Sequence, residues 1–185
     1  EIEPHSYGEP LLDGRLPSFC SYITQKIPLA KIAIFTNGEL LNIDWYKKLV
    51  SVGVNRFNVT QHLKDQSKGT LDVIKYREKH GYDNVEFAYT RLKHINSRGG
   101  LVDVDEGELR QECNYPDHHV GISFDGQIMI CCNDYLNEVN VGNVSNENII
   151  DIWQKPIYID IRTNIRSGNF TLDICKNCTD GKVYT

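Results

Sequence analysis

The stretch Ile32-Ala33-Ile34-Phe35-Thr36-Asn37-Gly38 decides the fold of the first half of this chain, because a short apolar run turns polar at its end. This pattern is typical of a buried strand that is followed by a loop. Two further β-rich runs, Asn55–Thr60 and Asn84–Thr90, follow it. The intervening segments have helical character, and we expect helices over Asp13–Gln25, Glu39–Val52 and Lys64–His80. Strands that alternate with helices predict a parallel sheet with right-handed crossovers.

Polar residues gather at the end of each predicted strand. The four clusters are Gly8-Glu9-Pro10, Thr36-Asn37-Gly38, Thr60-Gln61-His62 and Tyr89-Thr90-Arg91. Any one of them would fit an ordinary polar loop. Because parallel strands end on a common edge, and β/α architectures bind ligands at that edge, four such clusters together predict a shared ligand site.

A second module follows the strand–helix units. The period ends after about residue 91, and Arg98-Gly99-Gly100 is a loop signal. Val120–Phe124 and Gln127–Cys131 flank Asp125-Gly126, which predicts a hairpin. Beyond it we expect a helix over about Glu147–Gln154, capped by Ser145 or Asn146, a second helix from Pro156 to before Gly168, and a loop over Cys175–Cys178. We therefore predict two domains, 1–99 and 100–185.

Composition and charge restrict the classes of partner. The 185 residues are 40% hydrophobic and 24% charged, with a net charge of -5, so neither nucleic acid nor an anionic membrane is favoured as a partner. The apolar runs are too short to span a bilayer. The first residues lack the basic and apolar pattern of a signal peptide. We expect a cytoplasmic, reducing environment.

Six cysteines in such a chain need a chemical explanation. Disulfides are disfavoured in a reducing compartment. A C-x2-C unit presents two thiolates to one metal centre, and two more would close a four-thiolate cage; the candidates are Cys113, Cys131, Cys175 and Cys178. Soft thiolates select iron–sulfur clusters, zinc or copper(I). On spacing alone, a four-cysteine zinc site is as well supported as a cluster.

Cys132 adjoins Cys131, and only one of the two is expected to ligate. Adjacent side chains of an extended strand point to opposite faces. Cys20 falls on a predicted helix and is interpreted as a small core residue.

Several of these segments resemble radical S-adenosylmethionine (SAM) enzymes. Tyr7-Gly8-Glu9-Pro10-Leu11-Leu12-Asp13 is similar to their Gly-Glu-Pro segment after the second strand, and Phe35-Thr36-Asn37-Gly38 is similar to the Thr-Asn-Gly that ends the third. The second module resembles the SPASM/twitch extension, an auxiliary-cluster domain. The matching residues there are Cys113 with Pro116, Phe124-Asp125-Gly126, Cys131-Cys132-x-Asp134, Val141-Gly142-Asn143-Val144, Ile152-Trp153, Arg162 and Cys175-x-x-Cys178.

The resemblance implies an α/β fold: a partial (β/α) barrel of the radical SAM type, followed by a small α+β twitch/SPASM domain. It implies that the backbone around Gly8, Glu9 and Pro10 receives the methionine amino group of SAM. Thr36, Asn37 and Thr60 would line the rest of that site. A [4Fe-4S] auxiliary cluster would be ligated by Cys113, Cys131, Cys175 and Cys178, since the spacing from Gly126 favours Cys131 over Cys132.

One family motif is missing. The C-x3-C-x2-C that binds the catalytic cluster does not occur among these residues. We therefore expect a fragment that is inactive alone, with the second [4Fe-4S] cluster on an N-terminal part, although a degenerate relative is the alternative.

The resemblance also implies a chemistry for the intact enzyme. A flavodoxin- or ferredoxin-type reductant would supply the electron that cleaves SAM to a 5′-deoxyadenosyl radical, and this oxidoreductase would modify a peptide or a small metabolite such as an amino sugar. The auxiliary cluster would accept an electron or anchor the substrate. The rival hypotheses are a zinc-stabilised four-cysteine binding module without redox activity and a β/α enzyme with incidental cysteines.

Overall fold

The chain forms two compact units, and each is described by itself. The computed structural model describes residues 1–81, 84–91, 97–104 and 108–179. Contacts divide the chain into unit 1, residues 1–92, and unit 2, residues 93–185. The predicted domain limits, 1–99 and 100–185, stay a prediction.

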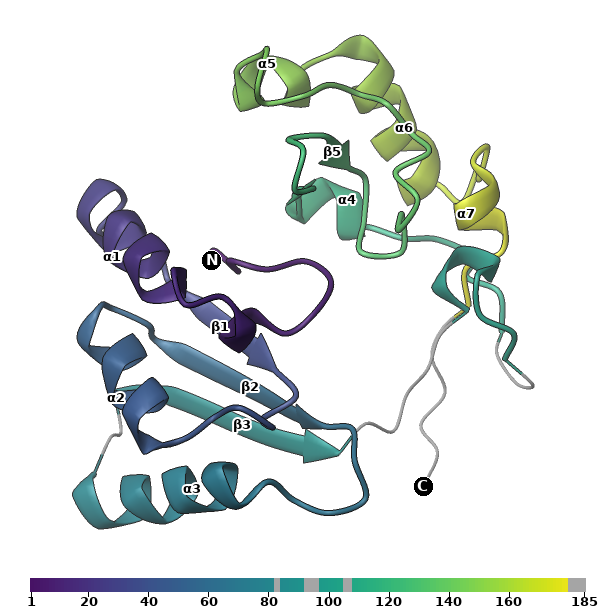
Figure 1. The fold of residues 1–185 in the computed structure, drawn as a ribbon. Coiled ribbons are helices and arrows are strands. Elements are labelled where there is room, and N and C mark those ends of the chain that lie inside the picture. Colours follow the sequence, from purple (N-terminus) through teal and green to yellow (C-terminus); the bar gives the residue numbers. More distant parts are fainter. Residues whose placement is uncertain (82–83, 92–96, 105–107, 180–185) are drawn as a thin grey trace. The chain divides into compact units, whose positions relative to one another are not determined.

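Unit 1 is a three-stranded parallel sheet with helices packed against it (Figure 1). The strands lie in the order β1-β2-β3. Along the chain the elements are η1 (Pro10–Leu12), α1 (Leu16–Lys26), β1 (Ala33–Thr36), α2 (Ile43–Ser51), β2 (Arg56–Gln61), α3 (Lys68–His80) and β3 (Glu86–Arg91). The predicted parallel sheet is confirmed, and each strand lies within two residues of its expected bounds.

Three helices begin later than the sequence suggests. We expected the first from Asp13, whereas α1 begins at Leu16. We expected helices from Glu39 and Lys64, whereas α2 begins at Ile43 and α3 at Lys68. The side chain of Asn42 accepts a hydrogen bond from the backbone N–H of Trp45, and Ser67 caps α3 in the same way. Capping side chains compete with the helical backbone, so the residues before them stay in the loops.

The two faces of the sheet differ, because side chains alternate along each strand. Phe57 and Phe87 pair in register, and the ring of Tyr46 from α2 lies 5.0 Å from that of Phe57. This face carries the core of unit 1. On the opposite face, the ring of Phe35 stacks on His5, with their centroids 5.6 Å apart. Alternate residues of each strand therefore face the helices, and the residues between them face the opposite side of the sheet.

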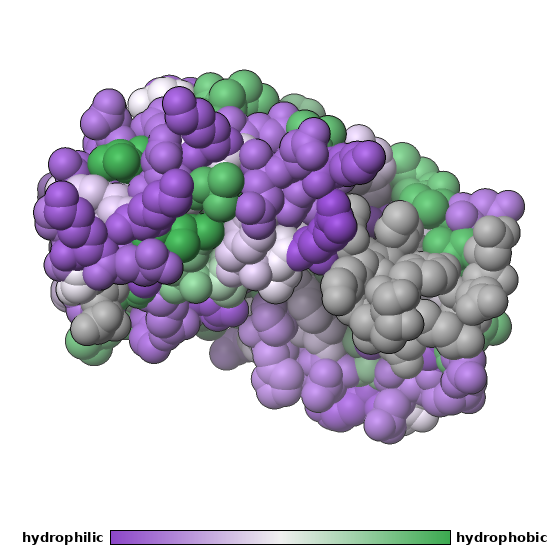
Figure 2. Space-filling view, turned by 90° about the horizontal axis from the view of Figure 1, so that it is seen from below, coloured by the Kyte–Doolittle hydropathy of each residue, from purple (hydrophilic) through white to green (hydrophobic). Residues whose placement is uncertain are grey.

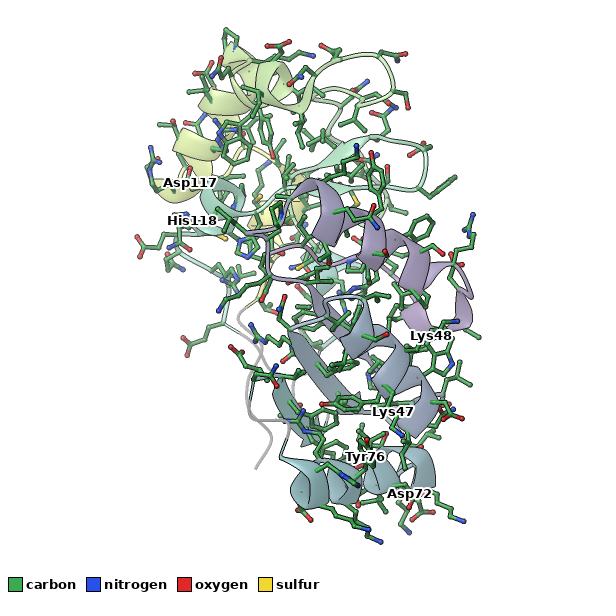
Figure 3. The ribbon with its side chains drawn as sticks, turned by 90° about the vertical axis from the view of Figure 1, so that its left-hand side faces the viewer. Lys47, Lys48, Asp72, Tyr76, Asp117 and His118 are labelled. Carbon is green, nitrogen blue, oxygen red and sulfur yellow. The ribbon has the colours of Figure 1, made fainter. Side chains whose placement is uncertain are left out.

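Contacts between helices add to this packing. Arg77 of α3 donates hydrogen bonds to the hydroxyl of Tyr46 and, at 2.7 Å, to the carbonyl oxygen of Val85. Its guanidinium also lies over the ring of Phe87, 5.0 Å from the centroid. At the outer surface of the same helices, the ammonium of Lys47 lies 4.8 Å from the ring centroid of Tyr76 (Figure 3).

Unit 2 consists of short elements. They are η2 (Arg98–Gly100), α4 (Tyr115–His118), β4 (Gly121–Ile122), β5 (Ile128–Met129), α5 (Ile149–Trp153), α6 (Pro156–Arg166) and α7 (Asp173–Lys176). Strands β4 and β5 pair antiparallel around Asp125-Gly126, so the predicted hairpin is confirmed. The helix expected from Pro156 is confirmed as α6.

Three details of unit 2 differ from expectation. The cap of α5 is Asn148, whose side chain accepts from the N–H of Ile150, rather than Ser145 or Asn146. Cys175 lies in α7 instead of a loop, because Asp173–Lys176 form one helical turn. Cys131 and Cys132 follow β5 in a bend, so strand alternation does not govern their directions.

A buried arginine organises the core of unit 2. This core consists of Ile128, Ile130, Val141, Ile152, Tyr158 and Ile165. The guanidinium of Arg162 lies 3.9 Å from the ring centroid of Trp153 and 4.5 Å from that of Tyr158, and it donates to the carbonyl oxygen of Trp153 at 2.9 Å. These contacts give a structural reason for the Ile152-Trp153 and Arg162 positions.

The surface agrees with the composition of the chain. Most of the face in Figure 2 is hydrophilic, with separate apolar residues between the polar ones. Among the described residues, no helix combines the length and the apolar character that crossing a bilayer requires.

Candidate functional site

The carboxylate of Glu9 joins three segments at the carboxyl edge of the sheet. Its Oε1 accepts from the hydroxyl of Thr36 at 2.7 Å and from the N–H of Leu11 at 3.0 Å. Its Oε2 accepts from the N–H of Asn37 at 2.8 Å. Two of the predicted polar clusters therefore lie together, and the residues of one hold the other in place.

The structure separates two predicted cofactor residues by face. Thr36 lies on the helix-covered face and is only 5% exposed, and its hydroxyl accepts from the N–H of Gly38 in addition to its bond to Glu9. Thr60 alternates with the buried Val59 and Gln61, so it lies on the opposite face. The Thr36 hydroxyl is thus occupied within the protein. Gly8 is exposed, and Pro10 is buried at the start of η1.

A polar cavity of about 280 Å³ lies at the same edge, against the loops that follow β1 and β2. Asn37, Gln61 and Tyr89 contribute to its wall, and Glu39 and Asp65 add two carboxylates. Among the described residues, its lining includes no lysine or arginine. Such a cavity suits a small hydroxylated or cationic ligand better than an anionic one.

Gln61 fixes the loop between β2 and α3. Its Nε2 donates to the carbonyl oxygens of Leu63, at 2.7 Å, and Lys64, at 3.0 Å. Its Oε1 accepts from the hydroxyl of Tyr89 on the neighbouring strand. The sequence placed Gln61 at a strand end but gave no signal for this role, because the bonds are made to a loop of unknown shape.

The four candidate cysteines of unit 2 lie near one another. Cys113, Cys131 and Cys175 pack against the same core. The charges of Cys178 and Cys113 both act on Cys175, so these sulfur atoms lie near one another. The N–H of Cys113 also donates to the carbonyl oxygen of Ile165 in α6, at 3.2 Å. Segments that are far apart in sequence thus bring their thiols together.

Burial raises the pKa of three of these thiols. It raises the pKa of both Cys131 and Cys175 to about 12. It also raises the pKa of Cys178, against the opposing positive charge of Arg110. A bound metal centre replaces those protons and stabilises thiolates at such a site. The donor set therefore has the chemistry that an iron–sulfur centre needs.

A single metal ion and a cluster place different demands on four thiols. A zinc ion would draw four sulfur atoms to about 2.3 Å from itself, whereas a four-iron cluster takes its thiolates at separate corners. Among the described residues, no group of three or more histidine, cysteine, aspartate or glutamate side chains is already placed to hold a metal ion.

Asn133 contacts two of the four sulfur atoms. Its backbone N–H donates to the Sγ of Cys131 at 3.3 Å, and its Nδ2 donates to the Sγ of Cys178 at 3.4 Å. Cys132 is exposed, whereas Cys131 is partly buried beside the core. This contrast favours Cys131 over Cys132 as the ligand. Sequence reasoning passed over Asn133 because it is the variable position of the Cys131-Cys132-x-Asp134 pattern.

Comparison with known proteins places these features in a family. The SPASM model, described as an iron–sulfur cluster-binding domain, matches residues 113–179. This range contains all four candidate cysteines of unit 2, together with Asn133.

The whole chain also matches known proteins. An S-adenosyl-L-methionine-dependent 2-deoxy-scyllo-inosamine dehydrogenase from Niallia circulans is 30% identical over 193 residues, which cover 100% of this chain and 74% of the relative. The crystal structure of BtrN in complex with AdoMet and 2-DOIA has a TM-score of 0.84 and 28% identity, covering 97% of this chain and 72% of BtrN. The crystal structure of BtrN in an open conformation has a TM-score of 0.75 and 26% identity, and the match covers 97% of this chain and 71% of BtrN. This chain belongs to the radical SAM superfamily, in its SPASM/twitch branch.

Proposed function

We propose that this chain is part of a radical SAM dehydrogenase that oxidises a hydroxyl group of a small, amine-bearing polyol. The similarity over the whole chain to a dehydrogenase of 2-deoxy-scyllo-inosamine carries this proposal. The small cavity at the sheet edge, with its two carboxylates, supports a small cationic metabolite over a peptide. Unit 1 would be part of a (β/α) barrel, and unit 2 would be a twitch-type domain.

Residues at the sheet edge would hold SAM. The backbone around Gly8, Glu9 and Pro10 would receive its methionine amino group, and Asn37 and Thr60 would line the remainder of the site. Thr36 would act indirectly. Its hydroxyl fixes the carboxylate of Glu9, at 2.7 Å, and thereby orients the Gly8-Glu9 backbone.

Unit 2 would hold the auxiliary [4Fe-4S] cluster through Cys113, Cys131, Cys175 and Cys178. Their proximity to one another and the N–H donors of Asn133 support this ligand set. Bound SAM and a catalytic cluster would supply radical chemistry that removes a hydrogen atom from the substrate, and the auxiliary cluster would take up the second electron as the substrate loses a proton. The protein's own contribution is to bind, orient and exclude water.

A zinc module is the second candidate. It would need four sulfur atoms around one ion. The six free cysteines agree with a reducing compartment, in which a flavodoxin- or ferredoxin-type reductant is available. Residues 1–185 contain no C-x3-C-x2-C motif, so we expect no cleavage of SAM by this chain alone.

Anaerobic reconstitution with iron and sulfide tests the metal assignment. We expect a brown protein with about four irons per chain, and loss of iron in Cys113→Ala, Cys131→Ala, Cys175→Ala or Cys178→Ala. Cys132→Ala is the matched control, since its thiol is exposed, and it should keep its iron. A colourless protein that binds one zinc would contradict the proposal.

Activity of the full-length protein encoded by the gene tests the reaction. With SAM, dithionite and 2-deoxy-scyllo-inosamine, we expect 5′-deoxyadenosine and the corresponding ketone in equal amounts. A peptide substrate, or formation of 5′-deoxyadenosine without any ketone from a hydroxylated amine, would contradict the assigned substrate class.

A further inference from the structure

Asn133 occupies a special place among the thiols of unit 2. It is only 7% exposed, and it directs two N–H donors at the sulfur atoms of Cys131 and Cys178. One of these cysteines follows the hairpin, and the other follows α7, 45 positions from Asn133. The carboxamide therefore connects the segment that follows the hairpin with the segment that follows α7.

The loop around Asn133 is held in a fixed conformation. The N–H of Asp134 donates to the carbonyl oxygen of Cys131 at 3.2 Å, and the N–H of Asn137 donates to that of Asp134 at 3.1 Å. Asp134 is fully buried, and its Oδ1 accepts from the N–H of Glu138 at 3.1 Å. These bonds close the turn that carries Asn133, whose side chain contacts Cys178.

Donors in this position favour extra negative charge on sulfur. A hydrogen bond to a charged acceptor is stronger than one to a neutral acceptor. One-electron reduction of a cluster adds negative charge that is shared with its thiolates, so N–H donors stabilise the reduced form more than the oxidised one. Hydrogen bonds to the sulfur atoms are among the factors that set the potential of iron–sulfur centres.

We propose that Asn133 is a positioning residue that raises the reduction potential of the auxiliary centre and holds Cys178 in place as a ligand. The inference rests on the proposed function, because it requires a centre bound by the four cysteines. It assigns the change in reduction potential to the side-chain carboxamide of Asn133, the position that the Cys131-Cys132-x-Asp134 pattern leaves unspecified.

Two variants separate the carboxamide from the backbone. Asn133→Asp keeps the shape of the side chain but replaces its N–H donor with a carboxylate oxygen, and Asn133→Leu removes all polar atoms. Both keep the backbone N–H that points at Cys131. The matched control is Asn146→Leu, which makes the same change at an exposed position of the same unit.

The experiment uses the anaerobically reconstituted chain. Iron content is measured first, then the midpoint potential by a dithionite titration followed by absorbance and electron paramagnetic resonance, and finally the rate of iron loss to a chelator. We expect a more negative midpoint potential in Asn133→Leu than in the wild type. The midpoint of Asn133→Asp should be the most negative of the three, because a carboxylate repels the added electron. Both variants should lose iron several-fold faster than Asn146→Leu.

The outcomes separate this inference from the proposed function. If the wild-type chain binds no iron cluster, the proposed function fails, and the inference fails with it. If the wild type binds a cluster but both variants match Asn146→Leu in midpoint, spectrum and rate of iron loss, only the role of Asn133 is overturned. A shifted midpoint at unchanged iron content supports it, since a purely structural role would not move the potential.

Discussion

Unit 1 and unit 2 differ in the length of their secondary structure elements and in the size of their hydrophobic cores. Unit 1 has a three-stranded sheet, helices of 9 to 13 residues and a core of thirteen buried residues. Unit 2 has two-residue strands, mostly four- or five-residue helices and a core of six buried residues beside its cysteines. Small cores usually need a metal or another cross-link. From this difference we expect that unit 2 depends on the proposed centre for its stability more than unit 1 does.

Removing one of the proposed cysteine ligands should therefore have the largest effect, and it should affect unit 2 but not unit 1. Structural metal sites contribute on the order of 10 kcal/mol to folding. In Cys175→Ala we expect amide protection across residues 113–179 to be lost in hydrogen–deuterium exchange, while β1, β2 and β3 keep theirs. Cys132→Ala, at the exposed neighbour of a ligand, should leave both patterns unchanged. Equal protection of unit 2 in the two variants would refute its dependence on a metal centre.

A glycine in unit 1 gives the next largest effect. Gly38 has a φ of +78°, and a Cβ there would lie 2.6 Å from Cγ1 of Val59 and 2.7 Å from Oγ1 of Thr70. Gly38→Ala should lower the free energy of unfolding of unit 1 by about 1–3 kcal/mol. Exchange protection of β1 and β2 measures this loss.

The control for this change is Gly14→Ala, because a Cβ at Gly14 meets no atom within 4 Å. If the two alanine variants have equal stability, the close packing of α3 against the β1 loop is not what requires Gly38.

Each unit contains an arginine that stacks on aromatic rings, so an arginine-to-lysine substitution can be compared in the two. Arg77 lies over Tyr46 and Phe87 and donates to Val85, while Arg162 lies over two aromatic rings and donates to Trp153. Lysine cannot reproduce the planar stack. We expect Arg77→Lys and Arg162→Lys each to cost about 1–2 kcal/mol.

Urea unfolding of the iron-loaded chain measures both costs. We expect iron removal to lower the midpoint of unit 2 by more than Arg162→Lys does, since the centre contributes more to its stability than one stacked side chain. A larger shift from Arg162→Lys than from iron removal would mean that the core, and not the centre, dominates the stability of unit 2.

The smallest effect concerns Cys20. Burial raises its pKa to about 11, from an ordinary value of 9.0. A raised pKa means that the folded state retains the proton, so the associated stability is complete below pH 9 and is lost as the pH rises through 11. Iodoacetamide at pH 8 should label Cys132 quickly and Cys20 only after unfolding. Fast native labelling of Cys20 would show that α1 opens readily.

Much of unit 1 could be predicted from the sequence, because apolar runs and caps are local signals. The strands lay close to their predicted bounds, and the parallel sheet followed from their alternation with helices. The bond between Glu9 and Thr36 could not be predicted, since it joins residues 27 positions apart and depends on which face of the sheet the helices cover.

In unit 2, the sequence predicted a set of cysteine ligands but not the side chains that contact them. The contact of Asn133 with Cys178 spans 45 positions. The helical turn at Cys175 was missed because a four-residue helix has too few side chains to show periodicity. Whether Cys131 or Cys132 faced the core depended on the bend after β5, which is set by hydrogen bonds to Asp134 and not by strand alternation.

The bonds of Gln61 have an evolutionary consequence. Its carboxamide donates hydrogen bonds to main-chain carbonyl oxygens of the loop after β2, and every amino acid has such an oxygen. The exposed side chains of residues 62–66 can therefore diverge without altering the path of the loop. Related sequences could acquire new ligand preferences at this rim by single mutations, while the scaffold beneath it stays unchanged.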